Sequence, residues 1–208
     1  MILGANAAAR MVAYNLSYDA NVEVIGFVDS DSAKWGTQLA GKPILGGDQM
    51  LPDLYSSGIR QAVIGVGEPR IRAKLRALLE SNGFELANAI HPSVLVSIAV
   101  KVGKGVVVEP GSVLSDNPVV EDNVWIGLAA TVSHDTRIGR DSLIGGRSAV
   151  GAEVDIGERT TVGWGSVVGP RRKIGSDAVI GFGSNVVTDI PDRAVAIGNP
   201  ARVIKYRD

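Results

Sequence analysis

Residues 126–151 read IGLAAT-VSHDTR-IGRDSL-IGGRSA-VG when the chain is broken every six residues. Each block begins with Ile or Val, and the same frame extends in both directions. It places Val, Ile or Leu at seventeen successive positions, namely Ile90, Val96, Val102, Val108, Leu114, Val120, Ile126, Val132, Ile138, Ile144, Val150, Ile156, Val162, Val168, Ile174, Ile180 and Val186. This period predicts a hexapeptide β-helix, in which three blocks form one triangular coil and successive coils pair at about 4.8 Å.

The other positions of the six-residue block agree with this fold. Glycine usually follows the aliphatic residue, although Ser133 is an exception. We attribute the recurring glycine to the backbone angles of tight corners. These glycines are Gly127, Gly139, Gly145, Gly151, Gly157, Gly163, Gly169, Gly175 and Gly181. Small or β-branched residues stand four positions after the aliphatic one, and we expect them to fill the narrow interior. A helix is excluded, because a period of six carries apolar residues around a 3.6-residue helix and dense glycine destabilises it.

Length and composition favour two domains in the 208-residue chain. We expect a Rossmann-like α/β domain in residues 1–88 and an all-β helix with a C-terminal capping segment in residues 89–208. The net charge of −1 and the lack of a basic cluster argue against a nucleic acid partner. Absent cysteines exclude disulfides, thiolate metal sites and a cysteine nucleophile. Neither a signal peptide nor a membrane span is recognisable, so we expect a cytoplasmic protein.

The first 88 residues alternate short aliphatic runs with helical patterns, as a parallel α/β layer does. We expect strands at residues 1–3, 22–29, 62–66 and 84–90. The clearest helix follows Gly67, because Pro69 suits its first turn and Asn82-Gly83 supplies a stop. Near the other end of the chain, residues 194–197 are expected to form a strand, and the segment beyond the last coil is expected to cap the open end of the β-helix.

Glycines and carboxylates stand at strand ends in the α/β domain, where a doubly wound sheet binds ligands. We therefore select a set of candidate sugar-nucleotide residues. It comprises Gly4, Ala5, Asn6, Asp29, Gly65 and Gly67. The run from Gly4 to Ala9 is not a GxGxxG, so a nucleotide crevice and ordinary turn chemistry are about equally supported by the residues alone.

The chain has two histidines, and their surroundings differ. His134 lies two residues after Val132 among polar neighbours, where Asp135 can hold one ring nitrogen and leave the other to accept a proton. A solvated surface histidine is an equally good interpretation. His91 precedes a proline at the domain junction, where a hydrogen-bonding structural role is favoured. Two histidines are too few for a zinc hydratase with three histidine ligands, and we assign no metal. We expect the coil aspartates to be solvated, namely Asp116, Asp122, Asp141, Asp155 and Asp177.

Backbone amides along an edge of the coils can grip a thioester or diphosphate. Ala152 stands eighteen residues after His134, one coil further on, so its amide is expected to receive an oxyanion near the imidazole. The candidate residues for cofactor binding are Gly145, Gly163, Gly165, Gly181, Gly198 and Pro200. Trp125 and Trp164 occupy outward positions of the frame, which indicates a subunit interface or, less favoured, a ligand groove.

Five stretches together resemble the sialic acid and bacillosamine-type sugar acyltransferases over nearly the whole chain. The stretches are Val24 to Asp29, Ile44 to Gly47, Ala89 to Ser93, Ser133 to Gly139 and Ile197 to Ala201. The resemblance implies a nucleotide-sugar-binding α/β domain before a left-handed β-helix, a homotrimer, and acetyl-CoA bound between two subunits. It also implies that His134 is the general base beside Asp135, and that Ala152 supplies an amide where some members use glycine.

Two positions depart from the pattern of that family. The first loop, Gly4 to Arg10, replaces a Gly-Ala-Gly-Gly-His-like run, and Gly127 stands where the family often has asparagine. The leading hypothesis is an acetyl-CoA-dependent acyltransferase acting directly on an amino or hydroxyl group of a nucleotide-activated sugar in surface polysaccharide synthesis. A non-catalytic sugar-nucleotide-binding or scaffold trimer is the alternative, and an acyltransferase for a free amino acid or free sialic acid is a third.

Overall fold

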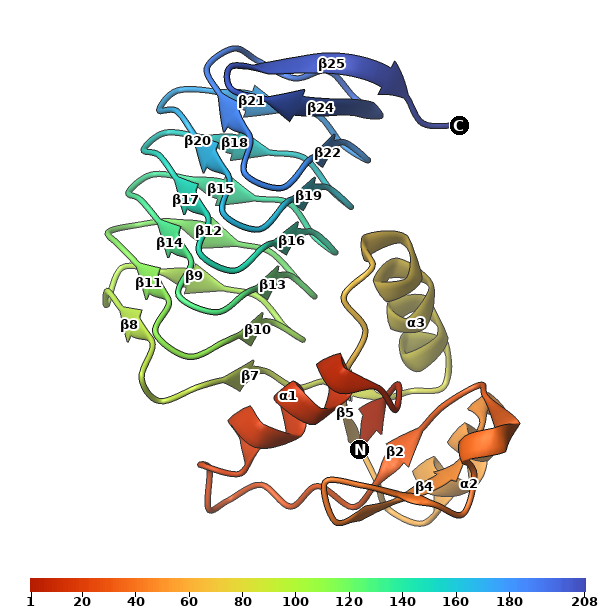
Figure 1. Cartoon of the computed structure of the whole chain (residues 1–208). Coiled ribbons are helices and arrows are strands. Elements are labelled where there is room, and N and C mark those ends of the chain that lie inside the picture. The colour runs from red at the N-terminus through yellow and green to blue at the C-terminus, as the bar shows by residue number, and fades with distance from the viewer.

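The computed structural model describes all 208 residues, as an α/β domain attached to the lower part of a stack of triangular coils (Figure 1). The α/β sheet has the strand order β3-β4-β2-β1-β5-β6, and only β3 and β4 pair in antiparallel fashion. Its strands are β1 (Ile2–Leu3), β2 (Phe27–Val28), β3 (Gln38–Leu39), β4 (Lys42–Gly46), β5 (Gln61–Ile64) and β6 (Glu85–Leu86). The helices are α1 (Ala7–Leu16), α2 (Leu51–Ser56) and α3 (Pro69–Ser81), with 3-10 turns η1 (Ser32–Lys34) and η2 (Asp48–Met50).

The expected helix after Gly67 is α3, and its start is fixed by Glu68, whose carboxylate accepts a hydrogen bond from the Ile71 amide at 2.7 Å. The strand expected over residues 22–29 is shorter and comprises β2 alone. The strand expected over residues 84–90 is divided in two. Its first part, β6, pairs with β5, whereas its last two residues, β7 (Ala89–Ile90), already pair with the coils, so the break marks the passage between domains.

The six-residue frame is confirmed along its whole length, because each of the seventeen aliphatic positions is the second residue of a two-residue strand. After β7 these strands are β8 (Leu95–Val96), β9 (Lys101–Val102), β10 (Val107–Val108), β11 (Val113–Leu114), β12 (Val119–Val120), β13 (Trp125–Ile126), β14 (Thr131–Val132), β15 (Arg137–Ile138), β16 (Leu143–Ile144), β17 (Ala149–Val150), β18 (Asp155–Ile156), β19 (Thr161–Val162), β20 (Val167–Val168), β21 (Lys173–Ile174), β22 (Val179–Ile180) and β23 (Asn185–Val186). We call these aliphatic residues the frame residues.

Strands one coil apart pair in parallel and form the three faces of a left-handed β-helix. The first face contains β7, β10, β13, β16, β19 and β22, the second runs from β8 to β23, and the third runs from β9 to β21. From Val108 to Val186 the frame residues are at most 2% exposed and form one continuous core. The small residues four positions later are also buried, and their hydroxyls donate to glycine carbonyls of the next coil, as from Ser148 Oγ to the Gly163 oxygen at 2.8 Å.

The glycines that follow the frame residues do not serve the backbone angles that we expected of them. The left-handed conformation occurs two residues later, at positions such as Asp135 (φ 55°) and Gly165 (φ 68°). A Cβ atom on Gly145 would instead lie 2.6 Å from the Trp164 amide nitrogen of the next coil. Gly127 shows the same constraint, with 2.6 Å to the Gly146 nitrogen. These glycines therefore allow successive coils to approach closely.

The α/β domain packs against the lower coils through their first face. Ala9 and Val12 of α1 share a buried cluster with Ala89, Val107 and Trp125 of the coils. Trp125 is only 3% exposed, so our expectation that it lies in a subunit interface or ligand groove is wrong. Its ring fills the joint between the two domains of one chain.

The C-terminal segment closes the upper end of the stack, as expected (Figure 1). Strand β24 (Ala194–Gly198) pairs with β22, and β25 (Ala201–Tyr206) folds back on it in antiparallel fashion. This hairpin covers the edge of the last coil on the first face. No helix of the chain has the length and apolar character needed to cross a membrane.

Candidate active site

His134 and Asp135 lie at the corner between the second and third faces, directly after β14. The His134 Nδ1 atom is 2.9 Å from Asp135 Oδ2, and both side chains are about half exposed. Asn117, one coil earlier, donates to the other carboxylate oxygen at 2.9 Å. The hydrogen bonds from His134 and then Asn117 hold the pKa of Asp135 below its ordinary value. The carboxylate thus orients the ring, and Nε2 remains available to accept a proton.

Ala152 lies at the same corner, one coil above His134. The two coils are joined there by a hydrogen bond from the Glu153 amide to the His134 carbonyl at 3.0 Å. The Ala152 N–H has no acceptor within the chain, whereas most amides near it are bonded between coils. An oriented, unbonded N–H next to a positioned imidazole is the arrangement that stabilises an oxyanion while a base removes a proton.

The candidate cofactor glycines lie at a different corner, between the first and second faces. Gly145, Gly163 and Gly181 follow β16, β19 and β22, and their amides are used to bond the coils together, as from Gly163 to the Ile180 carbonyl at 2.8 Å. The Gly165 amide is likewise bonded to the Gly146 carbonyl at 3.0 Å.

The remaining two cofactor candidates, Gly198 and Pro200, lie at the turn between β24 and β25, where the Gly198 amide donates to Ser184 Oγ at 3.1 Å.

At the corner between the first and second faces, the unbonded amides belong to Gly146, Trp164 and Phe182. We did not expect these residues from the sequence. Each stands two residues after a frame residue, the position that His134 and Ala152 occupy at their own corner. Counting this position along the frame was therefore the signal that could have found them.

A cleft of about 370 Å³ separates α3 from the upper coils. Gly67 and Pro69 line it from the α/β domain, while Gly163, Trp164 and Phe182 line it from the coils. Trp164 is about half exposed and thus lines a groove, the less favoured of the two interpretations of its outward position. The cleft brings one candidate nucleotide residue, Gly67, next to one candidate cofactor residue, Gly163.

The other candidate nucleotide residues converge at the carboxyl ends of β1, β2 and β5. A Cβ atom on Gly4 would lie 3.1 Å from the Gly65 carbonyl oxygen, and one on Gly65 would lie 2.6 Å from Cα of Ala9. Both glycines therefore let the loops and α1 meet closely. The Asn6 side chain caps α1 by accepting hydrogen bonds from the amides of two following residues.

Asp29 is held by the loop that follows β1. Its Oδ2 atom accepts the Ala5 amide at 2.5 Å, and its Oδ1 atom accepts the Asp31 amide at 2.9 Å. Burial alone raises the pKa of Asp29, but these two amides and the Lys34 ammonium outweigh it and lower the pKa below its ordinary value. The ionised Asp29 carboxylate therefore connects the loops that follow β1 and β2.

His91 has the structural role that we favoured for it. Its Nδ1 atom lies 2.7 Å from Ser93 Oγ, and the buried ring stacks on Tyr14 with 5.4 Å between ring centroids. Two of the coil aspartates are not solvated as we expected. Asp141 is fully buried against Arg76 and Asn123. Asp177 is mostly buried and forms ion pairs with Arg70 and Arg159. No three His, Asp or Glu side chains are grouped so that they could hold a metal ion.

Comparison with known proteins identifies the family of this chain. Residues 1–78 match the model of the PglD N-terminal domain. The structure of PerB from Caulobacter crescentus, solved with CoA and GDP-perosamine, is 36% identical, with 98% of this chain and 96% of that chain covered and a TM-score of 0.93. The chain belongs to the bacillosamine-type sugar acyltransferases. The resemblance noted from the five stretches is confirmed for this branch of the family, and the protein is accordingly an enzyme.

Other solved sugar acyltransferases agree at lower identity. The acetyltransferase domain of PglB from Neisseria gonorrhoeae, also solved with acetyl coenzyme A, is 29% identical, with 98% of both chains covered and a TM-score of 0.89. AntD, an N-acyltransferase from Bacillus cereus, is 16% identical over 58% of this chain and 81% of its own, with a TM-score of 0.54, and shares the fold alone.

Proposed function

We propose that this sugar acyltransferase transfers an acetyl group from acetyl-CoA to the amino group of a nucleotide-activated sugar. The observation that carries the proposal is the unbonded Ala152 amide one coil above a histidine whose Nδ1 is held by Asp135. The family comparison supplies the substrate class, because PerB was solved with CoA and GDP-perosamine. An amino acceptor fits the related structure named as a perosamine N-acetyltransferase.

In the proposed mechanism, the acceptor amine attacks the thioester carbonyl carbon of acetyl-CoA. Nε2 of His134 removes the amine proton, and the Ala152 N–H donates to the carbonyl oxygen as it becomes an oxyanion. Collapse of the tetrahedral intermediate forms the amide and breaks the carbon–sulfur bond. The CoA thiolate leaves and takes up a proton, so no acyl-enzyme is needed, in keeping with a chain that has no cysteine.

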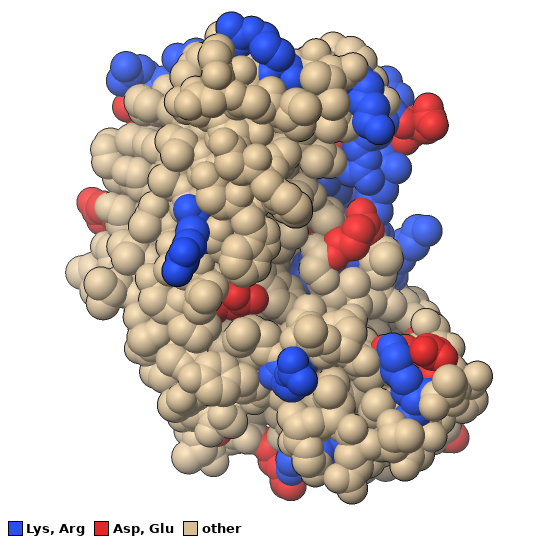
Figure 2. Space-filling model, in the orientation of Figure 1, with Lys and Arg blue, Asp and Glu red and all other residues tan.

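We further propose that the complete site forms between copies of this chain in a homotrimer. Within one chain, His134 and the cleft next to Trp164 lie at different corners of the β-helix, and we expect a second copy to bring a histidine corner to a cleft corner. The second face between these corners carries no charged residue on its strands. Its outward residues are Leu95, Val113, Thr131, Ala149, Val167 and Asn185. This side of the molecule is largely free of charged side chains in Figure 2.

The test of the chemistry is thiol release from acetyl-CoA with a panel of GDP-, UDP- and dTDP-linked amino sugars. We expect one of these acceptors to support turnover, and we expect His134→Ala to lower kcat by about 10²- to 10⁴-fold, the range for loss of a general base. Glu153→Gln is the matched control, because Glu153 is exposed at the same corner and the substitution removes a charge without changing the size of the side chain. Equal turnover by wild type and His134→Ala would exclude the assigned base.

Calorimetry with CoA tests the donor site without turnover, because the proposed transfer requires that the protein bind CoA. The shared site is tested by mixing two inactive variants, His134→Ala and Trp164→Glu, under conditions that exchange subunits. Recovery of activity in the mixture requires that one copy supply the histidine and another the cleft. A mixture that stays inactive although the subunits exchange would refute a site between copies.

A further inference from the structure

Arg72 is the largest fully buried side chain of the chain, and it carries a charge. It lies on α3 and directs its guanidinium at the coils. Nε donates to the Asn123 carbonyl at 2.9 Å, and Nη2 donates to the same carbonyl at 2.7 Å and to Asn123 Oδ1 at 2.6 Å. Nη1 donates to the carbonyls of Ile64 at 3.1 Å and Val66 at 2.8 Å. Five hydrogen bonds therefore satisfy the guanidinium completely.

These acceptors come from two places that the proposed reaction has to bring together. Ile64 ends β5, and with Val66 it flanks Gly65 at the edge of the α/β sheet that carries the candidate nucleotide residues, which we call the nucleotide-binding edge. Asn123 forms the corner between β12 and β13 and belongs to the run of coil that leads, eleven residues later, to His134. One side chain thus ties the nucleotide-binding edge of one domain to the coil that carries the base.

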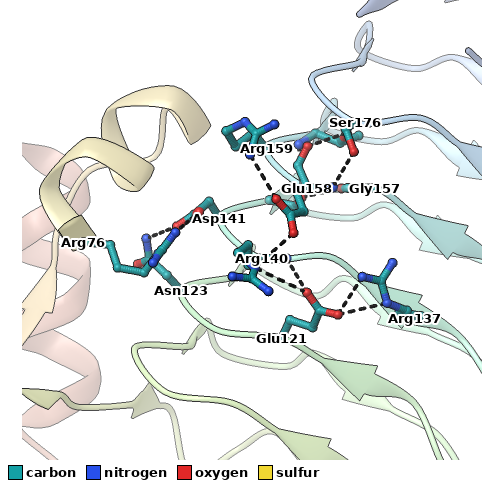
Figure 3. A network of polar contacts seen from close by, with 12 residues as sticks. Arg76, Glu121, Asn123, Arg137, Arg140, Asp141, Gly157, Glu158, Arg159 and Ser176 are labelled. Carbon is teal, nitrogen blue, oxygen red and sulfur yellow. Dashed lines mark hydrogen bonds and ion pairs between the residues drawn. The ribbon is translucent and has the colours of Figure 1, made fainter. Parts of the chain in front are cut away.

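A second contact holds the coil side of this joint. Asn123 donates from Nδ2 to the Arg72 carbonyl at 3.2 Å and to Asp141 Oδ1 at 2.7 Å. Asp141 in turn accepts two hydrogen bonds from Arg76 at 3.0 Å, as Figure 3 shows. The Trp125 ring lies 5.3 Å from the Arg72 guanidinium carbon. We call Arg72, Arg76, Asn123 and Asp141 the interdomain latch.

The latch specifies an orientation as well as an attachment. Apolar packing between α1 and the coils would tolerate small rotations of the domain, because such contacts have no preferred direction. A planar guanidinium has five donors in fixed directions. The carbonyls of Ile64 and Val66, at and just after the end of β5, and one corner of the coil satisfy these donors in only one relative position. Burial lowers the pKa of Arg72 and the Asp141 carboxylate partly opposes this shift, so that the pKa is about 9 and the side chain keeps its charge at neutral pH.

We propose that Arg72 is a positioning residue that sets the nucleotide-binding edge relative to the β-helix, so that the amino group of a nucleotide-linked acceptor reaches the base. The inference rests on the proposed function. Since the β-helices of an assembly pack as whole units, the latch fixes the domain against a neighbouring copy as well as its own. Binding of the nucleotide is a local property of the α/β domain, whereas delivery of the amine depends on the latch.

The kinetic test compares two acceptors in wild type, Arg72→Lys and the milder Asn123→Gly, which preserves the left-handed corner at φ 57° and the carbonyl that Arg72 uses. One acceptor is the nucleotide-linked amino sugar, and the other is the same amino sugar as its 1-phosphate. For the linked acceptor we expect Arg72→Lys to lower kcat about 100-fold, the loss that about 1 Å of misplacement produces, with the acetyl-CoA KM unchanged. The truncated acceptor should react at the same slow rate in all three proteins.

Arg70→Met is the matched control, because Arg70 also joins α3 to the coils, through Asp177 at 3.3 Å, but forms no hydrogen bond to β5. We expect it to leave the rate ratio of the two acceptors unchanged. A merely structural role for Arg72 would lower the rates with both acceptors equally, and that result would overturn the proposal. So would an unchanged ratio in Arg72→Lys.

A measurement that needs no turnover keeps the inference separate from the proposed function. The chain has no cysteine, so Ser56→Cys on α2 and Thr188→Cys on the coils can carry two spin labels, with unlabelled chain in excess. We expect a narrow distance distribution in the otherwise wild-type protein and a clearly broader one with Arg72→Lys. Distance distributions of equal width in the two proteins would overturn the proposed role of the latch. If no nucleotide sugar supported thiol release from acetyl-CoA, that result would count against the proposed function alone.

Discussion

Substitution of Gly145 by alanine tests the finding that the glycine row serves close stacking of the coils. The new Cβ would lie 2.6 Å from the Trp164 nitrogen, 2.8 Å from the Gly163 carbonyl carbon and 2.8 Å from the Val162 oxygen. All three are backbone atoms of the next coil, so none can move aside as a side chain would. Gly145 does not have a positive φ, so no strain of that kind is added.

We expect Gly145→Ala to lower the free energy of unfolding by about 3 kcal/mol, the upper part of the range for overpacking a well-packed interior. Gly165→Ala is the matched control at the same corner. Its φ is 68°, and its Cβ would have no atom within 4 Å, so only the left-handed backbone opposes alanine. That term is about 1–2 kcal/mol and is offset by roughly 0.4–1 kcal/mol from the stiffer unfolded chain, which leaves about 1 kcal/mol.

Thermal unfolding followed by circular dichroism can resolve this difference. In a chain of this length each kcal/mol shifts the Tm by roughly 2–4 °C, so we expect losses of about 6–12 °C for Gly145→Ala and about 2–4 °C for Gly165→Ala. Because stacked coils can unfold in steps, the comparison uses the same transition in both variants. A larger loss in Gly165→Ala would show that backbone angle, and not the approach of coils, governs the glycines of this corner.

Three further changes have expected outcomes of their own. Asp135→Asn removes the charge that holds the His134 ring and should lower kcat about 10-fold or more at unchanged acetyl-CoA KM; an unchanged kcat would show that the carboxylate is dispensable. Ser148→Ala deletes a buried hydrogen bond to the Gly163 carbonyl and should destabilise the chain by about 1 kcal/mol in urea titrations, with no loss expected if the carbonyl finds another donor. Burial raises the pKa of Glu109 above its ordinary 4.5, so the folded state binds the Glu109 proton more tightly than the unfolded state does. The contribution of Glu109 to stability therefore decreases as the pH rises from 4.5 through the higher pKa of the folded state. The unfolding free energy of wild type relative to Glu109→Gln should therefore decrease as the pH rises above about 4.5, and a difference that stays constant would contradict the burial argument.

The sequence by itself determined the β-helix and the place of its corners. From Ile90 to Val186 every coil has the same number of residues, so the position of a residue in the frame gives its face and its height by counting. This is why the sequence alone places Ala152 above His134, and why it pairs His134 with its chain neighbour Asp135. It also explains why the small buried residues were identified, since their spacing from the frame residues is constant.

Counting along the frame did not reveal what the residues at each position contact. The glycines that follow the frame residues show the limit: both a left-handed corner and a close neighbouring coil favour glycine, and the sequence does not separate the two. Only the distances between coils, such as that from Gly145 to Trp164, distinguish the two. Likewise, Gly145, Gly163 and Gly181 follow from the frame as neighbours along one edge, but only the structure shows that their amides donate to the next coil.

The joint between the domains was decided by tertiary structure alone. Arg72 and Asn123 are separated by 51 residues, and most of the acceptors of Arg72 are backbone carbonyls, which every residue carries and no sequence pattern marks. Trp125 occupies an outward frame position, and its burial depends on a domain that follows a different periodicity. Contacts inside the β-helix follow from the constant spacing of its repeat. Contacts between the β-helix and the non-repeating α/β domain depend on how the two surfaces pack.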